Sequence, residues 1–187
     1  MIYISLLRGI NVGGHKKVLM KDLKSAYQDL EFQYITTHLQ SGNVIFSSLK
    51  SNQHDLRAII ETKLKSSFGF NIPVQILSRQ DLEVIFKSCP FGLIDLQTDG
   101  TKVLVSFLSN EPSPDKQLSI QQNVQHPEKL VIQHKAAYLF CPNGYGRSKL
   151  SNTFIESQLG VRSTTRNWKT VSNLLNIIRS NDYSSMH

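Results

Sequence analysis

The strongest constraint on the fold is the order of strand-like and helix-like segments in residues 1–78. Short runs of β-branched and aromatic residues predict strands, and apolar residues at three- and four-residue spacing predict amphipathic helices. In chain order these are a strand at 2–7, a helix at 20–31, strands at 34–39 and 43–48, a helix marked by Leu56, Ile59, Ile60 and Leu64, and a strand at 72–77. This β-α-β-β-α-β order is that of the ferredoxin-like unit, an antiparallel sheet with both helices on one face.

The same order returns less regularly after a helix at 79–89 and a loop. The predicted elements are a strand at 102–108, a helix at 113–122, a hairpin of 129–134 and 137–141, a helix at 149–159, a strand at 162–165 and a C-terminal helix that contains Trp168 and Ile178. We therefore predict an α+β fold of two tandem ferredoxin-like (βαββαβ) subdomains with antiparallel sheets, plus a C-terminal helix. The predicted boundaries are 1–78 for the first subdomain, 79–100 for the connecting helix and loop, and 101–187 for the second subdomain with its C-terminal helix.

The charge balance is basic, with a formal net charge of +7 over 187 residues. It favours acidic partners such as nucleic acid, nucleotides or phosphorylated metabolites. No apolar run approaches the roughly 20 residues that span a bilayer, and the first strand lacks the features of a signal peptide. Two distant cysteines, Cys89 and Cys141, favour a reduced cytoplasmic protein without disulfides. We expect no membrane partner, and the sequence leaves the oligomeric state open.

Metal and cofactor chemistry is not indicated. The six histidines show no ligand spacing, and there is no CxxC motif, so we expect no metal ion and no cofactor. Cys141 precedes a proline at a strand end and is a candidate nucleophile, although a buried structural cysteine is more common. Acidic residues on the predicted helix faces are expected to be solvated, namely Asp22, Asp29, Asp55 and Glu61.

Three polar, glycine-bearing clusters stand out because they contain Arg, Lys, Asn, Ser and Thr but no Asp or Glu. The first is LRGINVGGHKK at 7–17, which follows a strand and leads towards a helix. Backbone N–H groups hold phosphate in that context, although the spacing is neither a P-loop nor GxGxxG. The alternative is a long turn whose glycines relieve strain. The candidate ligand-binding residues are Arg8, Gly9, Asn11, Gly13, Gly14 and Lys16.

The second cluster, QSGN at 40–43, contributes Ser41 and Asn43 as candidates, although this is also ordinary turn chemistry. We expect this hairpin turn and the 7–17 loop to leave the sheet at opposite ends, so that Ser41 and Asn43 serve a different surface from Arg8.

The third cluster combines GYGRSK at 144–149 with TTRNW at 164–168. Arg147 is suited to clamp a phosphate or carboxylate, and Ser148 is the predicted cap of the helix that begins near Lys149. Thr165 or Asn167 is expected to cap the last helix. The candidate ligand-binding residues are Arg147, Ser148, Lys149, Thr165, Arg166 and Asn167. The alternative is a capped helix with exposed basic residues.

We further expect the 7–17 loop and the GYGRSK turn to form one basic surface between the two halves, with TTRNW beside them. Cations gathered without acids repel one another, and a shared anionic ligand offsets that repulsion.

LRGINVGG, TTHLQSGNVIF, FGFNIPV, GYGRSKL and TTRNW occur in this order over roughly residues 2–178. Together they resemble the bacterial domain-of-unknown-function family numbered 1697. The resemblance implies a small cytosolic bacterial protein of two ferredoxin-like halves, and it implies no established activity.

Three functions follow as hypotheses. The first is a protein, enzymatic or not, that binds a phosphorylated small molecule or nucleotide through these Gly/Arg/Lys/Asn loops. The second is a nucleic-acid-binding protein, with structured RNA as its expected partner. The segment SGNVIFSS disfavours one form of it, the RNA-recognition fold, because it lacks the paired stacking aromatics of that fold's third strand. The third is a structural or partner-binding protein without a ligand. The sequence does not decide whether the chain is an enzyme, and it indicates no catalytic residue.

Overall fold

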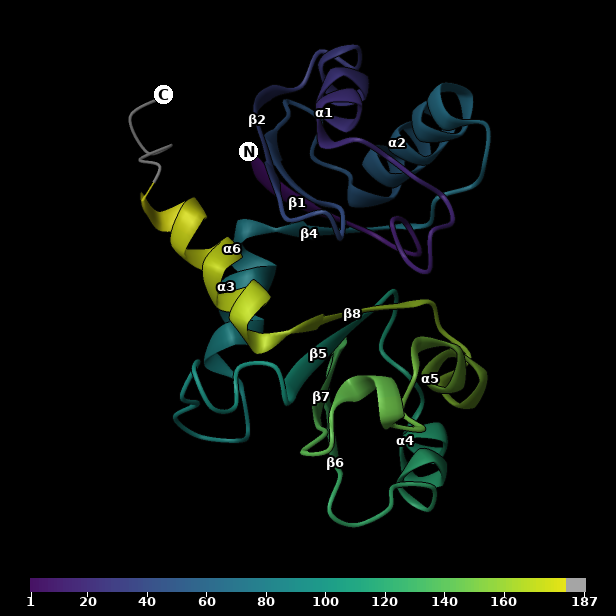
Figure 1. Cartoon of the computed structure of the whole chain (residues 1–187), viewed down its shortest axis with the longest axis vertical. Coiled ribbons are helices and arrows are strands. Elements are labelled where there is room, and N and C mark those ends of the chain that lie inside the picture. Colours follow the sequence, from purple (N-terminus) through teal and green to yellow (C-terminus); the bar gives the residue numbers. More distant parts are fainter. Residues whose placement is uncertain (181–187) are drawn as a thin grey trace. The chain divides into compact units, whose positions relative to one another are not determined.

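The computed structural model describes residues 1–180 and has an α+β architecture with two four-stranded antiparallel sheets and a C-terminal helix (Figure 1). The chain divides into two compact units. Among the described residues, unit 1 contains Met1–Glu83 and residues 176–180, and unit 2 contains Val84–Leu175. Within residues 1–180, no helix is both long and apolar enough to cross a membrane.

Unit 1 contains the six elements that the sequence predicts. They are β1 (Ile2–Leu7), α1 (Met20–Gln28), β2 (Gln33–His38), β3 (Asn43–Ser47), α2 (Gln53–Phe68) and β4 (Val74–Ser78). The strand order is β2-β3-β1-β4, so β4 is an edge strand, as Pro73 before it predicts. Gly69 ends α2 in the left-handed conformation that glycine adopts without a steric penalty.

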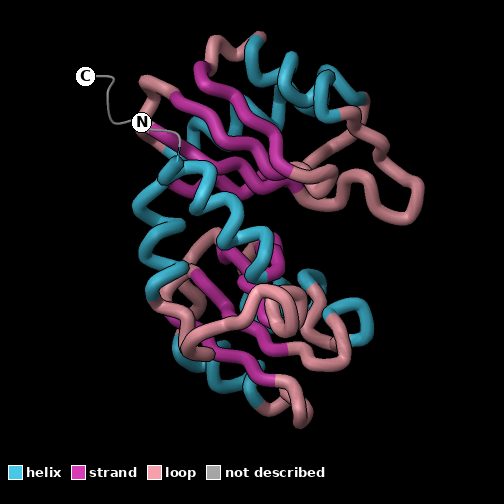
Figure 2. Tube along the Cα trace, turned by 60° about the vertical axis from the view of Figure 1, so that its left-hand side comes forward, coloured by secondary structure: helices cyan, strands magenta, loops and turns pink. Residues whose placement is uncertain are grey.

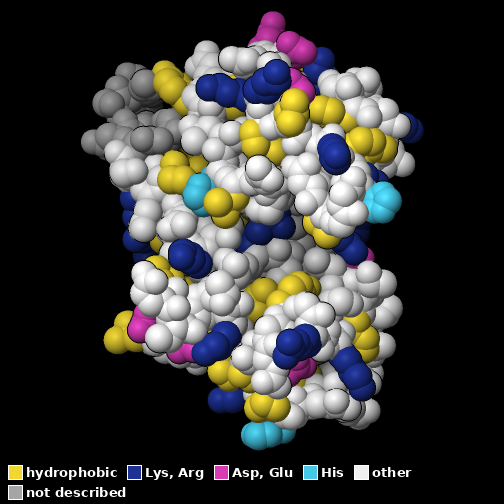
Figure 3. Space-filling view, viewed as in Figure 1, with side chains coloured by type: hydrophobic (Ala, Val, Ile, Leu, Met, Phe, Trp, Pro, Cys, Tyr) yellow, Lys and Arg dark blue, Asp and Glu magenta, His cyan; other side chains and the backbone are white. Residues whose placement is uncertain are grey.

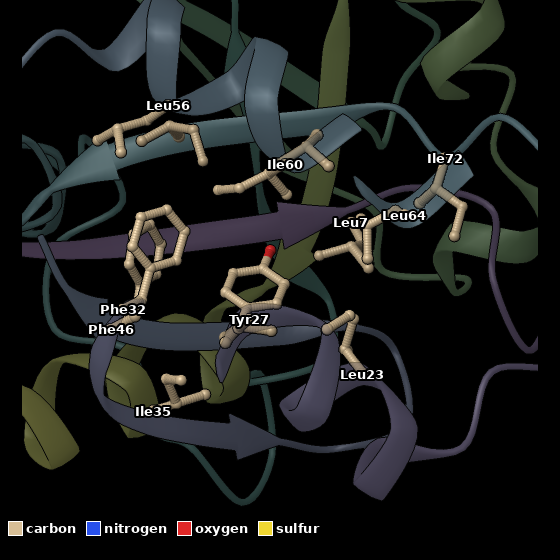
Figure 4. Packing of buried hydrophobic residues seen from close by; sticks show 14 of the residues in the cluster. Leu7, Leu23, Tyr27, Phe32, Ile35, Phe46, Leu56, Ile60, Leu64 and Ile72 are labelled. Carbon is tan, nitrogen blue, oxygen red and sulfur yellow. The ribbon is translucent and has the colours of Figure 1, made fainter. Parts of the chain in front are cut away.

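The core of unit 1 lies between the sheet and its two helices. Alternate residues of β1, such as Tyr3 and Leu7, share this core with Tyr27 of α1 and Ile60 of α2, and Figure 2 shows the helices along one face of these strands. In Figure 4 the Tyr27 ring lies among the aliphatic side chains with its hydroxyl directed towards β1. That hydroxyl is 2.6 Å from Ser5 Oγ, so the buried Ser5 hydroxyl of β1 is satisfied.

Unit 2 repeats the order. The link is α3 (Arg79–Lys87), and β5 (Val103–Leu108), α4 (Pro114–Gln121), β6 (Lys129–Gln133), β7 (Ala136–Phe140), α5 (Asn152–Leu159) and β8 (Ser163–Asn167) follow. The strand order is β6-β7-β5-β8. A buried cluster that includes Leu104, Leu139, Ile120 and Ile155 joins the sheet to α4 and α5, which lie next to each other in Figure 1.

The C-terminal helix, α6 (Trp168–Ser180), starts directly after β8. Asn167 caps it, because its side-chain oxygen accepts hydrogen bonds from Thr170 N at 2.9 Å and from Thr170 Oγ1 at 2.8 Å. Trp168 is buried and stacks on Phe86 with ring centroids 4.9 Å apart. The first turn of α6 is therefore anchored both by a polar cap and by an aromatic contact.

One helix start differs from the prediction. Ser148 does not cap α5: a short 3-10 helix, η1 (Tyr145–Arg147), comes first, and Ser148 is extended. The cap is Ser151, whose Oγ accepts from Phe154 N at 3.2 Å. The two serines have the same chemistry, and the turn before the helix determines which of them reaches a free N–H.

The predicted subdomain boundaries at residues 78 and 101 stay a prediction. The division of the chain into two compact units falls within α3, between Glu83 and Val84.

Candidate functional site

Three loops meet at one end of the unit 1 sheet: residues 8–19 after β1, residues 39–42 between β2 and β3, and residues 69–73 before β4. Leu7 N donates to Gly42 O at 2.8 Å, and Arg8 N donates to Pro73 O at 2.9 Å. The expectation that the first two loops leave the sheet at opposite ends is therefore wrong. β1 and β3 are antiparallel neighbours, with Leu6 opposite Asn43, so the end of β1 lies beside the start of β3.

Asn11 ties these loops together. Its amide Nδ2 donates to Gln40 O at 2.8 Å and to Val18 O at 3.0 Å, while its Oδ1 accepts from Val18 N at 2.9 Å. Asn11 adopts φ +55°, a left-handed conformation that asparagine tolerates better than most residues. The Asn11 side chain therefore makes the hydrogen bonds that hold the 8–19 loop against the QSGN turn. This structural role explains why an asparagine stands at this position.

Gly13 and Gly14 form the tip of a small hairpin. Asn11 N donates to Lys16 O, His15 N donates to Val12 O, and the two glycines have φ +60° and +77°. Positive φ at both central residues is typical of a type I′ turn. The backbone conformation of this turn thus explains why glycine stands at positions 13 and 14. That these glycines bind a ligand stays a prediction.

The first of these loops carries Arg8, Lys16 and Lys17, and none of the three contains Asp or Glu. Lys16, Lys17 and His15 are exposed and Arg8 is half-buried. Lys16 Nζ donates to Asn71 O at 3.3 Å and lies 5.7 Å from the centre of the Phe70 ring. On the face drawn in Figure 3, Lys and Arg side chains are spread over much of the surface. These loops of unit 1 are therefore basic.

The QSGN turn is closed by the side chain of Asn43. Asn43 is fully buried, and its amide donates to His38 O at 2.8 Å and to Ser41 Oγ at 3.0 Å. Ser41 itself is exposed. These bonds give Asn43 a role in closing the hairpin, whereas the side chain of Ser41 is accessible at the end of the sheet.

In unit 2 the GYGRSK and TTRNW segments lie together. Thr165 Oγ1 accepts from Tyr145 OH at 3.3 Å and donates to Asn152 Oδ1 at 2.7 Å. It also hydrogen-bonds Ser106 of β5, and Ser163 Oγ donates to Asn152 Oδ1 at 3.0 Å. This network of hydroxyl groups attaches the turn and the start of α5 to β8, so Thr165 serves as its centre.

Arg147 and Lys149 are exposed beside this network. Within residues 1–180, neither forms an ion pair with a carboxylate. Arg166 points to the opposite face of the sheet from Thr165, because side chains alternate along a strand, and its guanidinium donates to Thr165 O at 2.9 Å. Burial lowers the pKa of Arg166 to about 10, so the group is charged at neutral pH.

A hollow of about 400 Å³ opens between the end of α4 and the start of α5. It is lined by Gln122, Asn123, Gln125, Ser148, Lys149, Ser151 and Phe154, and we call it the amide hollow. Ser148 and Lys149 are predicted site residues, whereas the three amide residues were not foreseen. Their signal is the run QQNVQ at 121–125, which lies in a weakly patterned stretch of the sequence.

Two other expectations concern reactive and acidic groups. Cys141 is fully buried, and burial raises the pKa of its thiol, which fits a structural cysteine. Glu61 is not simply solvated: its Oε1 accepts from Val74 N at 2.8 Å, as Glu156 Oε1 does from Ser163 N at 2.8 Å in unit 2. Each carboxylate satisfies the first N–H of an edge strand. No group of three or more His, Cys, Asp or Glu able to hold a metal occurs among the described residues.

The loops of unit 1 and the GYGRSK turn belong to different units, so the expectation that they form a single site stays a prediction.

Comparison with other proteins supports the fold and the family. The structure is similar to that of a conserved bacterial protein, SP0830 from Streptococcus pneumoniae, with a TM-score of 0.73 and 21% identity over 95% of this chain and 98% of the other. At that identity the likeness concerns the fold alone. A search of curated proteins found no match. A family model matches residues 1–138. This range contains the motifs LRGINVGG, TTHLQSGNVIF and FGFNIPV, whereas GYGRSKL and TTRNW lie beyond it. The chain therefore belongs to the family described as "Protein of unknown function (DUF1697)".

Proposed function

We propose that the protein, built of two ferredoxin-like units and cytoplasmic, binds a phosphorylated small molecule, with the amide hollow of unit 2 as the binding site. The observation that carries the proposal is the composition of the lining: one ammonium group, three side-chain amides, two hydroxyls and one aromatic ring, with no carboxylate. A volume of about 400 Å³ lies in the range of small-molecule sites.

The phosphate end of the ligand belongs at the start of α5. Lys149 is exposed and supplies a positive charge, and the N-terminal N–H groups of a helix favour an anion. Ser151 Oγ accepts from Phe154 N and keeps its own O–H for donation, since a hydroxyl group both accepts and donates. Arg147, two residues before Lys149, adds a second cation in the same turn.

The test is calorimetric titration of the full chain with inorganic phosphate and pyrophosphate at low salt. We expect saturable binding that Lys149→Gln weakens at least about tenfold, since one charge-assisted contact contributes about 1.5–3 kcal/mol. The matched control is Lys135→Gln, an exposed lysine in the β6–β7 turn at the other end of the same sheet. Absence of saturable binding, or an equal effect of both variants, would contradict the proposal.

A second candidate partner is nucleic acid, and the acid-free loops of unit 1 favour it. Lys16 and Lys17 lie in a hairpin whose tip is exposed, a position from which they reach a phosphate backbone. Fluorescence anisotropy with a single-stranded RNA 20-mer over a salt series distinguishes the two functions. Several phosphate contacts give a steep fall of affinity with salt, whereas one phosphate site gives a shallow one. Replacing both lysines by glutamine then lowers the slope by about 2.

A further inference from the structure

We infer that the ligand of the amide hollow is a sugar phosphate; this inference rests on the proposed function and specifies its ligand class. The side chains that line the hollow divide into two groups. Lys149 and Ser151 lie at the start of α5, and Gln122, Asn123 and Gln125 follow the end of α4. A ligand that uses both groups has one charged end and an uncharged, polar body.

The chemistry of the α4 group matches hydroxyl groups. A side-chain amide carries two donor hydrogens and an acceptor oxygen, and a sugar hydroxyl likewise donates and accepts. Gln122 and Gln125 are exposed, and their side chains have no hydrogen-bond partner in the described part of the protein. They are therefore available to a ligand, whereas Gln121 beside them is occupied by its bond to Leu130 O at 3.1 Å.

The aromatic content of the hollow favours a sugar over a nucleobase. Phe154 is the one aromatic residue of the lining and is half-buried, packed against the core of unit 2. A single ring edge or face suits the C–H groups of a sugar. Unpaired bases are typically held by stacking on aromatic rings or Arg guanidinium planes, and the lining has one aromatic ring and no arginine.

The test compares four probes by calorimetry at one ionic strength: glucose 6-phosphate, glucose, inorganic phosphate and adenosine monophosphate. We expect glucose 6-phosphate to bind at least tenfold more tightly than inorganic phosphate. The double variant Gln122→Ala, Gln125→Ala should remove this advantage, so that glucose 6-phosphate binds no more tightly than inorganic phosphate, while Lys149→Gln weakens both. The control is Gln80→Ala, an exposed glutamine of α3, which should have no effect. Circular dichroism confirms that each variant is folded.

Each outcome decides between the ideas. If phosphate binds and the sugar phosphate binds no more tightly, the sugar inference is wrong and the proposed function stands. If adenosine monophosphate binds more tightly than glucose 6-phosphate, the ligand is a nucleotide and the inference is again wrong. If none of the phosphorylated probes binds, both the inference and the proposed function fail.

Discussion

Adding one methyl group at Gly42, by the substitution Gly42→Ala, should lower the free energy of unfolding by an amount that the structure allows us to calculate. It is buried in the β2–β3 turn with φ +76°, and its backbone oxygen accepts the bond from Leu7 N. A Cβ at this position would lie 2.8 Å from Leu7 Cβ and 2.7 Å from Ile10 Cδ1. The end of the Ile10 side chain can rotate away, but Leu7 Cβ is attached to the backbone of β1, so the strand and the turn must separate.

The expected cost of Gly42→Ala has two parts. A left-handed conformation costs a non-glycine residue about 1–2 kcal/mol, and overpacking a filled core costs about 1–3 kcal/mol more. The matched control is Gly14→Ala, since Gly14 has φ +77° but nothing within 4 Å of the added methyl group. The control therefore shows the conformational cost alone, and the difference between the two variants isolates the steric cost.

The assay is equilibrium unfolding in urea followed by far-ultraviolet circular dichroism. We expect Gly42→Ala to lower the free energy of unfolding by about 2–5 kcal/mol and Gly14→Ala by about 1–2 kcal/mol. The comparison is valid only if the dependence on urea concentration, the m-value, is the same for both variants. Equal destabilisation would refute the reasoning, because it would show that the contact with Leu7 relaxes without cost.

Four further predictions follow from other contacts. Ser151→Ala removes the cap of α5 and should destabilise by about 1 kcal/mol, whereas Ser151→Asp retains an acceptor and should not, as urea unfolding will show. Burial raises the pKa of Tyr27 above its usual value of about 10. The unfolded chain therefore loses the Tyr27 proton at a lower pH than the folded protein, and the free energy of unfolding falls as pH rises above about 10. Tyr27→Phe should make the urea midpoint less dependent on pH between about 9 and 11. Arg147→Ala and Arg166→Ala should each weaken pyrophosphate binding if both arginines serve one anion, and an effect of Arg147→Ala alone would show that they do not. Elemental analysis of protein purified without added metal should find no stoichiometric zinc or iron, and a stoichiometric metal would overturn the metal-free expectation.

The sequence by itself determined the types and order of the elements, because local periodicity and turn residues act over a few residues. Leu23 and Tyr27 belong to the apolar repeat that predicts α1. Gly69 and Gly160 end α2 and α5 in the left-handed conformation that is typical of glycine at the end of a helix. Asn167 was one of the two residues expected to cap the last helix, because capping uses an N–H only three residues further along. All these signals are confined to one or two turns of chain.

Tertiary structure decided what depends on residues distant in the sequence. Asn11 meets Gln40 only because β1 and β3 are antiparallel neighbours, and this pairing placed the first two polar clusters at the same end of the sheet. Likewise, Gln122 and Lys149 line one hollow because α4 and α5 pack side by side. Composition signals which side chains can bind an anion, but the pairing of strands and the packing of helices determine which of them share a surface, since those contacts carry no local periodicity.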